Sequence, residues 1–307
     1  MPTSEAPSRR QRDSAMTREN LGGALLSRLE AEHTEWRPLL LLVEAALGEM
    51  ERPIWSESVP LLEESADAGQ PLLSGATIRI APGPVRRWVR RAMTIACGGA
   101  SAPRLVDALA ARRLDPLALF EASLANDSDR LDDLGRAAGD DRGALRLVGP
   151  IVAMPMLHAC REAWTPLVPA AWAKGYCPIC GGWPALAETR GLDNQRRLRC
   201  PRCGGDWRTE AMRCPFCEER GHAHLSSLVP EGSGQETVDV CERCRHYVKA
   251  LTVLSPIPPE HVFLQDLATL VLDLLGLERG YQRPAARGDR VEVIATPSRL
   301  QALLGLR

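Results

Sequence analysis

Eight cysteines between residues 177 and 244 carry the clearest chemical signal in the sequence, because they occur as four Cys-x-x-Cys pairs. The pairs are Cys177/Cys180, Cys200/Cys203, Cys214/Cys217 and Cys241/Cys244. Two residues between the cysteines of a tight turn allow both sulfurs to face one ion, and a second turn alongside completes a tetrahedron. We therefore expect two tandem metal sites, the first formed by the first two pairs and the second by the last two.

Two other uses of paired cysteines fit the pattern less well. Four disulfides would also account for eight cysteines, but disulfide scaffolds are typically short and secreted, whereas this chain has 307 residues and no evident secretory segment. A redox Cys-x-x-Cys of the thioredoxin kind needs a strand before it and a helix after it. Four copies in a glycine-rich, hairpin-like stretch favour metal binding instead.

The residues beside the cysteines predict that the first site is the more regular one. Residues 177–182 and 200–205 are near copies, Cys-Pro-x-Cys-Gly-Gly, in which proline fixes the turn and glycine accepts a left-handed backbone. The third pair keeps the proline but is followed by Glu218 and Glu219. The fourth pair has neither proline nor glycine.

Four thiolates suit either zinc or iron in a rubredoxin-type centre, since both ions accept tetrahedral sulfur. Arginines are frequent around the pairs, and their simplest role is to compensate the thiolate charge. Contact with an acidic partner or a nucleic acid is the alternative. These arginines are Arg196, Arg197, Arg199, Arg202, Arg208, Arg213, Arg243 and Arg245.

Bulk properties narrow the class of protein. A length of 307 residues allows two or three domains. The formal net charge of -1 argues against a dedicated nucleic-acid binder, whose domain is usually strongly basic. Without an apolar leader or a run of 18 apolar residues, neither a signal peptide nor a membrane helix is expected. Because the cysteines are not expected to form disulfides, the sequence predicts a cytoplasmic protein.

Before the cysteines the sequence predicts helices. Residues 1–20 are polar and expected to be disordered, and residues 21–172 form a mostly helical domain. Residues 52–83 look like a long irregular connection. Asp115 followed by Pro116 predicts a helix start. Residues 85–95 form an amphipathic helix with arginines on one face, which we expect to be a solvated basic face; docking of an acidic partner segment is the alternative.

The cysteine region reads as two β-hairpin modules, 173–212 and 213–255, followed by a helical segment over 256–307. Hairpins are predicted at 185–199 and 224–240, and an uninterrupted helix at 260–277. The expected fold class is thus α+β and multidomain. It combines a mostly helical N-terminal domain, two tandem rubredoxin-like or zinc-ribbon four-cysteine modules, and a C-terminal helix that packs on them.

No other residues suggest catalysis. Cys97 and Cys160 are isolated and are expected to be small buried hydrophobes, and His158 lies on an apolar helix as a core histidine. Asp266 and Asp273 lie seven residues apart on a predicted helix; paired carboxylates can serve acid–base or metal chemistry, but a polar edge or salt bridges to the arginines of the cysteine modules are expected here. Phosphate loops, dinucleotide fingerprints and hydrolase triads are not evident in the sequence.

The cysteine array resembles the formate dehydrogenase accessory protein family of the FdhE type. The resemblance rests on the four pairs in this order, on Cys-Pro-Ile-Cys-Gly-Gly-Trp-Pro from Cys177, and on Tyr247 and Lys249 after the last pair. It continues through the helix that begins at Gln265, and through Gly280-Tyr281. It covers roughly residues 170 to 281.

The resemblance implies a cytoplasmic, non-catalytic maturation factor that formate dehydrogenase requires for activity and that binds its catalytic subunit. It also implies two iron ions, each held by four of the eight cysteines, with zinc as the alternative metal. Nucleic acid and membrane are not expected as partners, and a homodimer remains open. The alternative functions are an iron-tetrathiolate electron-transfer protein and, less favoured, a zinc-ribbon nucleic-acid binder.

Overall fold

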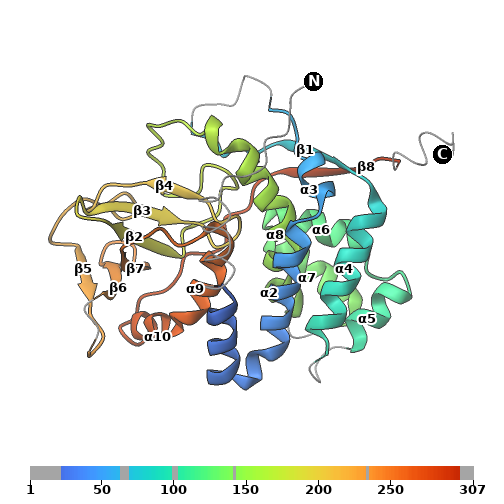
Figure 1. Ribbon diagram of the computed structural model, residues 1–307, viewed down its shortest axis with the longest axis horizontal. Coiled ribbons are helices and arrows are strands. Elements are labelled where there is room, and N and C mark those ends of the chain that lie inside the picture. Colours follow the sequence, from blue (N-terminus) through green and yellow to red (C-terminus); the bar gives the residue numbers. More distant parts are fainter. Residues whose placement is uncertain (1–21, 63–68, 99–102, 141–142, 233–234, 298–307) are drawn as a thin grey trace, which may run out of the picture.

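The computed structural model describes residues 22–62, 69–98, 103–140, 143–232 and 235–297. It consists of a helical body beside a six-stranded sheet, with two short helices packed against the sheet (Figure 1). The expected disorder of residues 1–20 and the last part of the C-terminal segment lie outside the described residues. The predicted class, a mostly helical N-terminal part followed by two four-cysteine clusters in tandem, is confirmed.

The helical body begins with a helix over 22–32. Its other helices are η1 (Thr34–Trp36), α2 (Arg37–Met50), α3 (Pro53–Glu57), α4 (Pro82–Ala96), α5 (Pro103–Ala110), α6 (Pro116–Ala125), α7 (Ser128–Ala138), α8 (Ala144–Trp164) and η2 (Thr165–Leu167). α8 is apolar on nearly all sides and contacts α2, α3, α4, α6 and α7, so it forms the centre of the body. The predicted start of α6 is confirmed, because the Asp115 carboxylate accepts a hydrogen bond from the Leu117 amide at 3.1 Å.

A two-stranded parallel sheet joins distant parts of the chain. β1 (Ala76–Ile80) pairs with β8 (Val291–Ala295), and the two strands lie together across the top of the helical body (Figure 1). The prediction of an irregular connection over 52–83 was therefore wrong in part, since this stretch contains α3 and β1. β1 has no hairpin partner nearby in the sequence, and its pairing partner lies more than 200 residues later.

The six-stranded sheet contains both cysteine modules. Its strands are β2 (Leu186–Arg190), β3 (Gln195–Arg199), β4 (Asp206–Arg208), β5 (Leu225–Leu228), β6 (Glu236–Cys241) and β7 (Tyr247–Val253), in the spatial order β4-β3-β2-β7-β6-β5. Both predicted hairpins are present. The link between them is the parallel pairing of β2 with β7, in which Leu186 lies opposite Lys249. The two modules thus share one continuous sheet.

The predicted helix over 260–277 is wrong at one point. The chain forms η3 (Pro259–His261), α9 (Val262–Ala268) and α10 (Leu270–Glu278), with a break at Thr269. At the break, a buried lysine binds the helix backbone. The ammonium of Lys249, on β7, donates to the backbone carbonyl of Asp266 at 2.6 Å and lies 3.5 Å from that of Thr269. The Asp266 carbonyl thus accepts from side chains, whereas the Thr269 carbonyl also accepts from the amide of Leu272 at 3.0 Å, in the first turn of α10.

Among the helices in the described part of the chain, none combines the length and apolar character needed to cross a bilayer.

Candidate metal centres

The first four-cysteine cluster is completely enclosed by protein. Cys177 Sγ lies 3.5 Å from Cys203 Sγ, and Cys180 Sγ lies 3.4 Å from Cys200 Sγ. All four sulfurs lie within 4.8 Å of one another, and each residue is at most 2% exposed. A tetrahedron with metal–sulfur bonds of ~2.3 Å places its sulfurs ~3.8 Å apart, so this cluster has the dimensions of a tetrathiolate site.

The second cluster has the same dimensions but lies nearer the surface. Cys214 Sγ is 3.7 Å from Cys244 Sγ, and Cys217 Sγ is 3.6 Å from Cys241 Sγ. Cys217 and Cys244 are half-buried, whereas the other two are buried. The two quartets are those expected from the order of the pairs along the chain. All eight thiols are free, and their separations exceed the ~2.05 Å of a disulfide bond.

All four Cys-x-x-Cys turns share one backbone conformation. In each, the amide four residues after the first cysteine donates to that cysteine's carbonyl at 2.9–3.0 Å. The first cysteine's own amide donates to the carbonyl one residue further on, at 2.8–3.0 Å. The residue four positions after the first cysteine has a positive φ in every turn: Gly181 71°, Gly204 69°, Glu218 65° and Arg245 59°. The second cluster is irregular in sequence but not in backbone, and two residues with side chains occupy a conformation that favours glycine.

The first cluster lies at the junction of the helical body and the sheet. The amides of Leu72 and Leu73 donate to the carbonyls of Pro178 and Ile179, both at 2.9 Å. Arg202 is 7% exposed, and its guanidinium donates to the carbonyls at residues 123 and 124, at the end of α6, at 2.8 and 2.9 Å. A buried side chain from a metal-knuckle turn therefore caps the end of a helix in the body.

The glycines of the first cluster are required by close packing as well as by φ. A Cβ placed on Gly204 would lie 2.3 Å from the carbonyl oxygen of Pro259, in η3. A Cβ on Gly181 would lie 2.1 Å from a carboxylate oxygen of Asp289, in the segment before β8. Helical body, sheet and C-terminal segment thus all meet at this cluster. Its integrity should determine how these three parts are held together.

Aromatic rings connect the two clusters. Trp183 follows the first Cys-x-x-Cys turn of the first cluster, and Phe216 lies within the first such turn of the second cluster. The centroids of their rings are 5.5 Å apart. Phe216 in turn lies 5.6 Å from the ring of His246. Beside the second cluster, a cavity of about 300 Å³ is bordered by Cys214, Cys241 and the inner face of the sheet. The second cluster therefore has less protein around it than the first.

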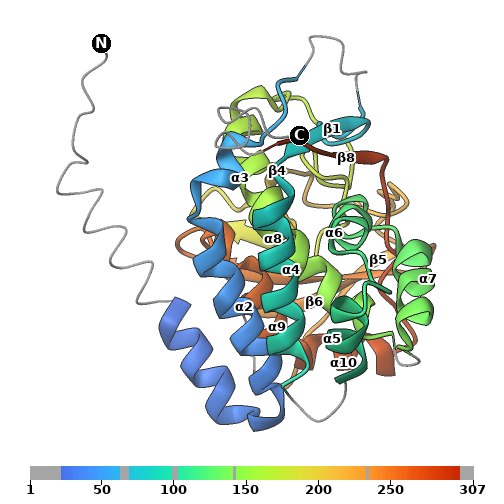
Figure 2. The same cartoon turned by 90° about the vertical axis from the view of Figure 1, so that its right-hand side faces the viewer.

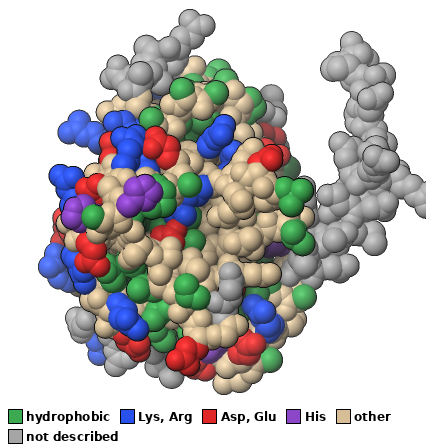
Figure 3. Space-filling view, turned by 90° about the vertical axis from the view of Figure 1, so that its left-hand side faces the viewer, with side chains coloured by type: hydrophobic (Ala, Val, Ile, Leu, Met, Phe, Trp, Pro, Cys, Tyr) green, Lys and Arg blue, Asp and Glu red, His purple; other side chains and the backbone are tan. Residues whose placement is uncertain are grey.

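Most of the arginines near the cysteine turns have partners within the chain. Arg196 pairs with Asp239 at 2.5 Å, and Arg243 pairs with Glu219 at 2.8 Å. On the sheet side of the molecule, basic and acidic side chains lie interspersed (Figure 3). Arg243 also holds the pKa of the Glu219 carboxyl down at about 2, chiefly through this hydrogen bond. The surface around the clusters is consequently mixed in charge.

A buried ionic network lies on the opposite face of the sheet from the cavity. Lys249 is 0% exposed, and its ammonium lies 2.6 Å from a carboxylate oxygen of Asp266 and 2.8 Å from one of Asp273. Arg283 lies 2.6 Å from both carboxylates, and the Tyr247 hydroxyl donates to Asp273 at 2.6 Å. Two cations face two carboxylates, so the network is neutral. The two aspartates do form salt bridges, but their partners are Lys249 and Arg283, which lies outside the cysteine modules, and not the arginines near the cysteine turns.

The network shifts the acidity of its members. Burial alone would raise the pKa of Asp266, but the charges of Arg283 and Lys249 outweigh it, and the pKa lies below its ordinary value. Burial and the hydrogen bond to Asp273 raise the pKa of Tyr247. These shifts favour a charged Asp266 and a neutral Tyr247. Sequence reasoning gave Tyr247 and Lys249 no structural role, although a lysine inside an apolar strand is a signal of a buried ion pair.

Other candidates from the sequence lie apart from the quartets. Cys160 and His158 are buried in α8, and burial lowers the pKa of His158 to about 3, as expected of a neutral core histidine. Cys97 is half-buried at the end of α4. Within the described ranges, the cysteine quartets are the groups of His, Cys, Asp and Glu side chains close enough together to hold a metal ion.

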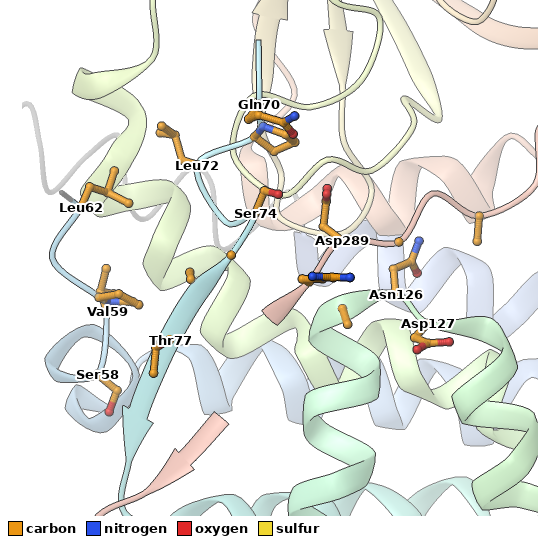
Figure 4. A pocket seen from close by; sticks show the side chains of 18 of the residues that line it. Ser58, Val59, Leu62, Gln70, Leu72, Ser74, Thr77, Asn126, Asp127 and Asp289 are labelled. Carbon is orange, nitrogen blue, oxygen red and sulfur yellow. The ribbon is translucent and has the colours of Figure 1, made fainter. Parts of the chain in front are cut away.

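A larger cleft of about 1,560 Å³ opens beside β1. Figure 4 shows Ser58 and Thr77 on one side of it and Asn126 and Asp127 on the other, with Asp289 between them. Burial raises the pKa of the Asp289 carboxyl. This aspartate also packs against the first cluster at Gly181, so the cleft borders the junction described above.

Comparison with known proteins finds one family that part of this chain resembles. Residues 212–287 match the family model "FdhE, C-terminal domain". The chain is 34% identical over 115 residues to Protein FdhE of Escherichia coli O127:H6 (strain E2348/69 / EPEC) and, to the same extent, to that of Shigella boydii serotype 18 (strain CDC 3083-94 / BS512). Each of these alignments covers 36% of this chain and 36% of the relative, so the match spans about a third of the relatives' length.

The fold extends the likeness beyond the aligned segment. The crystal structure of the FdhE protein from Pseudomonas aeruginosa superposes with a TM-score of 0.53 at 19% identity, over 88% of this chain and 93% of that one. The sequence match is thus confined to part of the chain, whereas the shared fold includes the helical body. The family model and the aligned relatives confirm the resemblance carried by the cysteine array over the part of the chain that they match, and the fold resembles that of an FdhE protein over most of the chain.

Proposed function

We propose that this protein is an accessory factor required for formate dehydrogenase activity, that it binds the catalytic subunit of that enzyme in the cytoplasm, and that it catalyses no reaction itself. The observation that carries the proposal is the pair of cysteine quartets built into one sheet on an FdhE-type fold. Sites closed by four protein sulfurs have no open position for a substrate, which favours a scaffold over a hydrolase.

We propose iron as the metal in both centres, with Cys177, Cys180, Cys200 and Cys203 as ligands of one ion and Cys214, Cys217, Cys241 and Cys244 as ligands of the other. Sulfur separations of 3.4–3.7 Å fit the donor set. Zinc fits the same geometry and is the alternative. When bound, iron supplies a one-electron couple, whereas zinc supplies only a crosslink. In either case the chain's own turns fix the ligand positions by their shared backbone hydrogen bonds.

A binding and complementation experiment tests the accessory role. The purified chain should bind the purified catalytic subunit from the same host, and deletion of its gene should abolish formate dehydrogenase activity. The wild-type gene should restore that activity, whereas a Cys177→Ser/Cys203→Ser gene should not. Normal enzyme activity in the deletion strain, together with no binding of the subunit, would refute the proposal.

A second candidate function, electron transfer, is favoured by one feature. The second cluster has two half-buried cysteines, and the rings of Trp183 and Phe216 lie in contact between the clusters. If the chain transfers electrons, protein isolated from its own host should show the visible bands of a ferric tetrathiolate that disappear with dithionite. Colourless protein that contains stoichiometric zinc would exclude this function.

A further inference from the structure

Four arginines form a continuous basic surface on α4. Arg86, Arg87, Arg90 and Arg91 are all exposed, and below they are called the arginine face. The opposite side of the same helix is buried, and Trp88 is fixed to α8 by a hydrogen bond from its indole Nε1 to the Val152 carbonyl at 2.9 Å. The arginine face is therefore held outward by the core. Figure 2 shows α4 exposed on this side of the molecule, between α2 and α6.

The arginine face has no counter-charges within the described residues. α4 itself contains no acidic residue, and none of the four arginines has a carboxylate oxygen of a described residue within 4.0 Å. Several exposed arginines on other elements do have such partners. For example, Arg220 pairs with Glu210 at 2.8 Å, and Arg136 pairs with Asp133. On α4, four exposed arginines without such a partner among the described residues lie side by side on one helix.

The spacing of these arginines opposes the stability of the free protein. Arg86 and Arg90, and likewise Arg87 and Arg91, are four residues apart on the helix, and Arg87 and Arg90 are three apart. Like charges at these spacings are neighbours on a helix surface and repel each other. A ligand that supplies negative charge would relieve this repulsion, so the arginine face is suited to an anionic partner.

The character of the face favours protein carboxylates over nucleic-acid phosphates. Nucleic-acid surfaces usually extend along a basic track with aromatic rings available for stacking, within a strongly basic domain. Here the chain has a formal net charge of -1, and the aromatic residue of α4, Trp88, is 1% exposed. Four arginines on little more than one helical turn instead match a compact group of carboxylates, which arginine binds in a bidentate manner.

We propose that the arginine face docks onto a carboxylate-rich surface of the formate dehydrogenase catalytic subunit. This inference rests on the proposed function and adds the surface through which the partner is bound. Exposed charge pairs at the rim of an interface act mainly on the association rate and on its dependence on salt. Binding should therefore weaken steeply as the salt concentration rises.

The test compares two variants of the full-length, metal-loaded chain that lose the same charge. The face variant is Arg86→Gln/Arg87→Gln/Arg90→Gln/Arg91→Gln. The control variant changes four exposed arginines that lie on other elements, namely Arg28→Gln/Arg136→Gln/Arg208→Gln/Arg279→Gln. Affinity for the purified catalytic subunit is measured at low and at physiological salt. Circular dichroism and melting temperature confirm that each variant is folded.

We expect the face variant to bind at least tenfold more weakly and with a flatter salt dependence, and the control variant to bind within twofold of wild type. The face variant should melt no lower than wild type, since repulsion has been removed. Equal binding by the face variant and wild type would overturn this inference alone. No binding by wild type would overturn the proposed function and this inference with it. Tighter binding of a single-stranded 20-mer DNA than of the subunit, lost in the face variant, would assign the face to nucleic acid instead.

Discussion

The buried lysine of the sheet should be one of the most sensitive positions in the protein. Lys249→Met keeps the length and apolar stem of the side chain but removes the ammonium that contacts Asp266 and Asp273. The substitution leaves two carboxylates with Arg283 as their remaining cation. It also removes the donor that holds the carbonyl of Asp266 at the break between α9 and α10.

The expected loss can be worked out from these contacts. Removing one partner of a buried ion pair typically lowers the free energy of unfolding by about 3–5 kcal/mol. Arg283 still neutralises one of the two aspartates, and methionine fills the space without a cavity, so the lower end applies, about 3 kcal/mol. With a urea m-value of about 3 kcal/mol per molar for a chain of this size, the unfolding midpoint should fall by about 1 M.

Urea unfolding of the metal-loaded protein, followed by circular dichroism, measures this loss. The chain supplies its own control, because its other lysine, Lys174, is exposed, and Lys174→Met should change the free energy of unfolding by less than about 0.5 kcal/mol. Adding Asp273→Asn to Lys249→Met should recover part of the loss, since it removes the uncompensated charge. A loss below about 1 kcal/mol for Lys249→Met would refute the view that this ammonium holds α9 and α10 on the sheet.

Three further predictions concern the cysteine turns and the ionic network. Gly204→Ala should lower the free energy of unfolding by more than the ~1 kcal/mol of left-handed backbone strain, because the added Cβ would also meet the Pro259 carbonyl. Glu218→Gly should raise the free energy of unfolding by up to ~1 kcal/mol, because glycine adopts the positive φ of this position without strain. Thermal unfolding measures both changes. Because the pKa of Asp266 is lowered in the folded state, its contribution to the free energy of unfolding should be present above pH ~4 and lost as the pH falls through the folded pKa. Asp266→Asn should therefore reduce the loss of stability between neutral and acidic pH. A chelator should remove metal from the second cluster first, since two of its cysteines are half-buried. Metal release should then occur in a fast and a slow phase, and a Cys217→Ser variant, in which the second cluster lacks one ligand, shows which phase belongs to that cluster.

Each of these three has an outcome that would contradict it. Equal stability of Gly204→Ala and wild type would mean that the contact with Pro259 yields easily. An unchanged loss of stability at acidic pH in Asp266→Asn would show that the aspartate is not ionised by the network. Loss of both metal ions in a single phase would indicate that the two clusters open together.

The sequence predicted the parts of the structure that depend on local patterns. The quartets follow from turn chemistry repeated four times, and the start of α6 follows from one aspartate before a proline. Local patterns do not report pairing between distant segments. β7 reads as an ordinary apolar run with a lysine in it. Every residue from Tyr247 to Leu251 is buried because the strand lies between β2 and β6 in the sheet and contacts α10.

The same limit explains the break in the predicted helix over 260–277. The apolar periodicity of this segment continues through Thr269, so the sequence alone favours one helix. At the break, the ammonium of Lys249 binds the backbone carbonyl of Asp266, which a continuous helix would use internally. Part of the predicted apolar stripe is also exposed: Val271 is 61% and Leu274 is 53% exposed. A buried charge on β7 thus contacts the backbone of the C-terminal helical segment at the point where the helix breaks.

The pairing of β1 with β8 has a consequence for synthesis on the ribosome. β1 emerges early, but its partner emerges only after both cysteine quartets and the whole six-stranded sheet have been translated. Until then the nascent helical body lacks its closing strand, while both thiol clusters are already complete and able to capture their ions. The order of the elements therefore allows both ions to be bound before β1 and β8 pair and close the helical body.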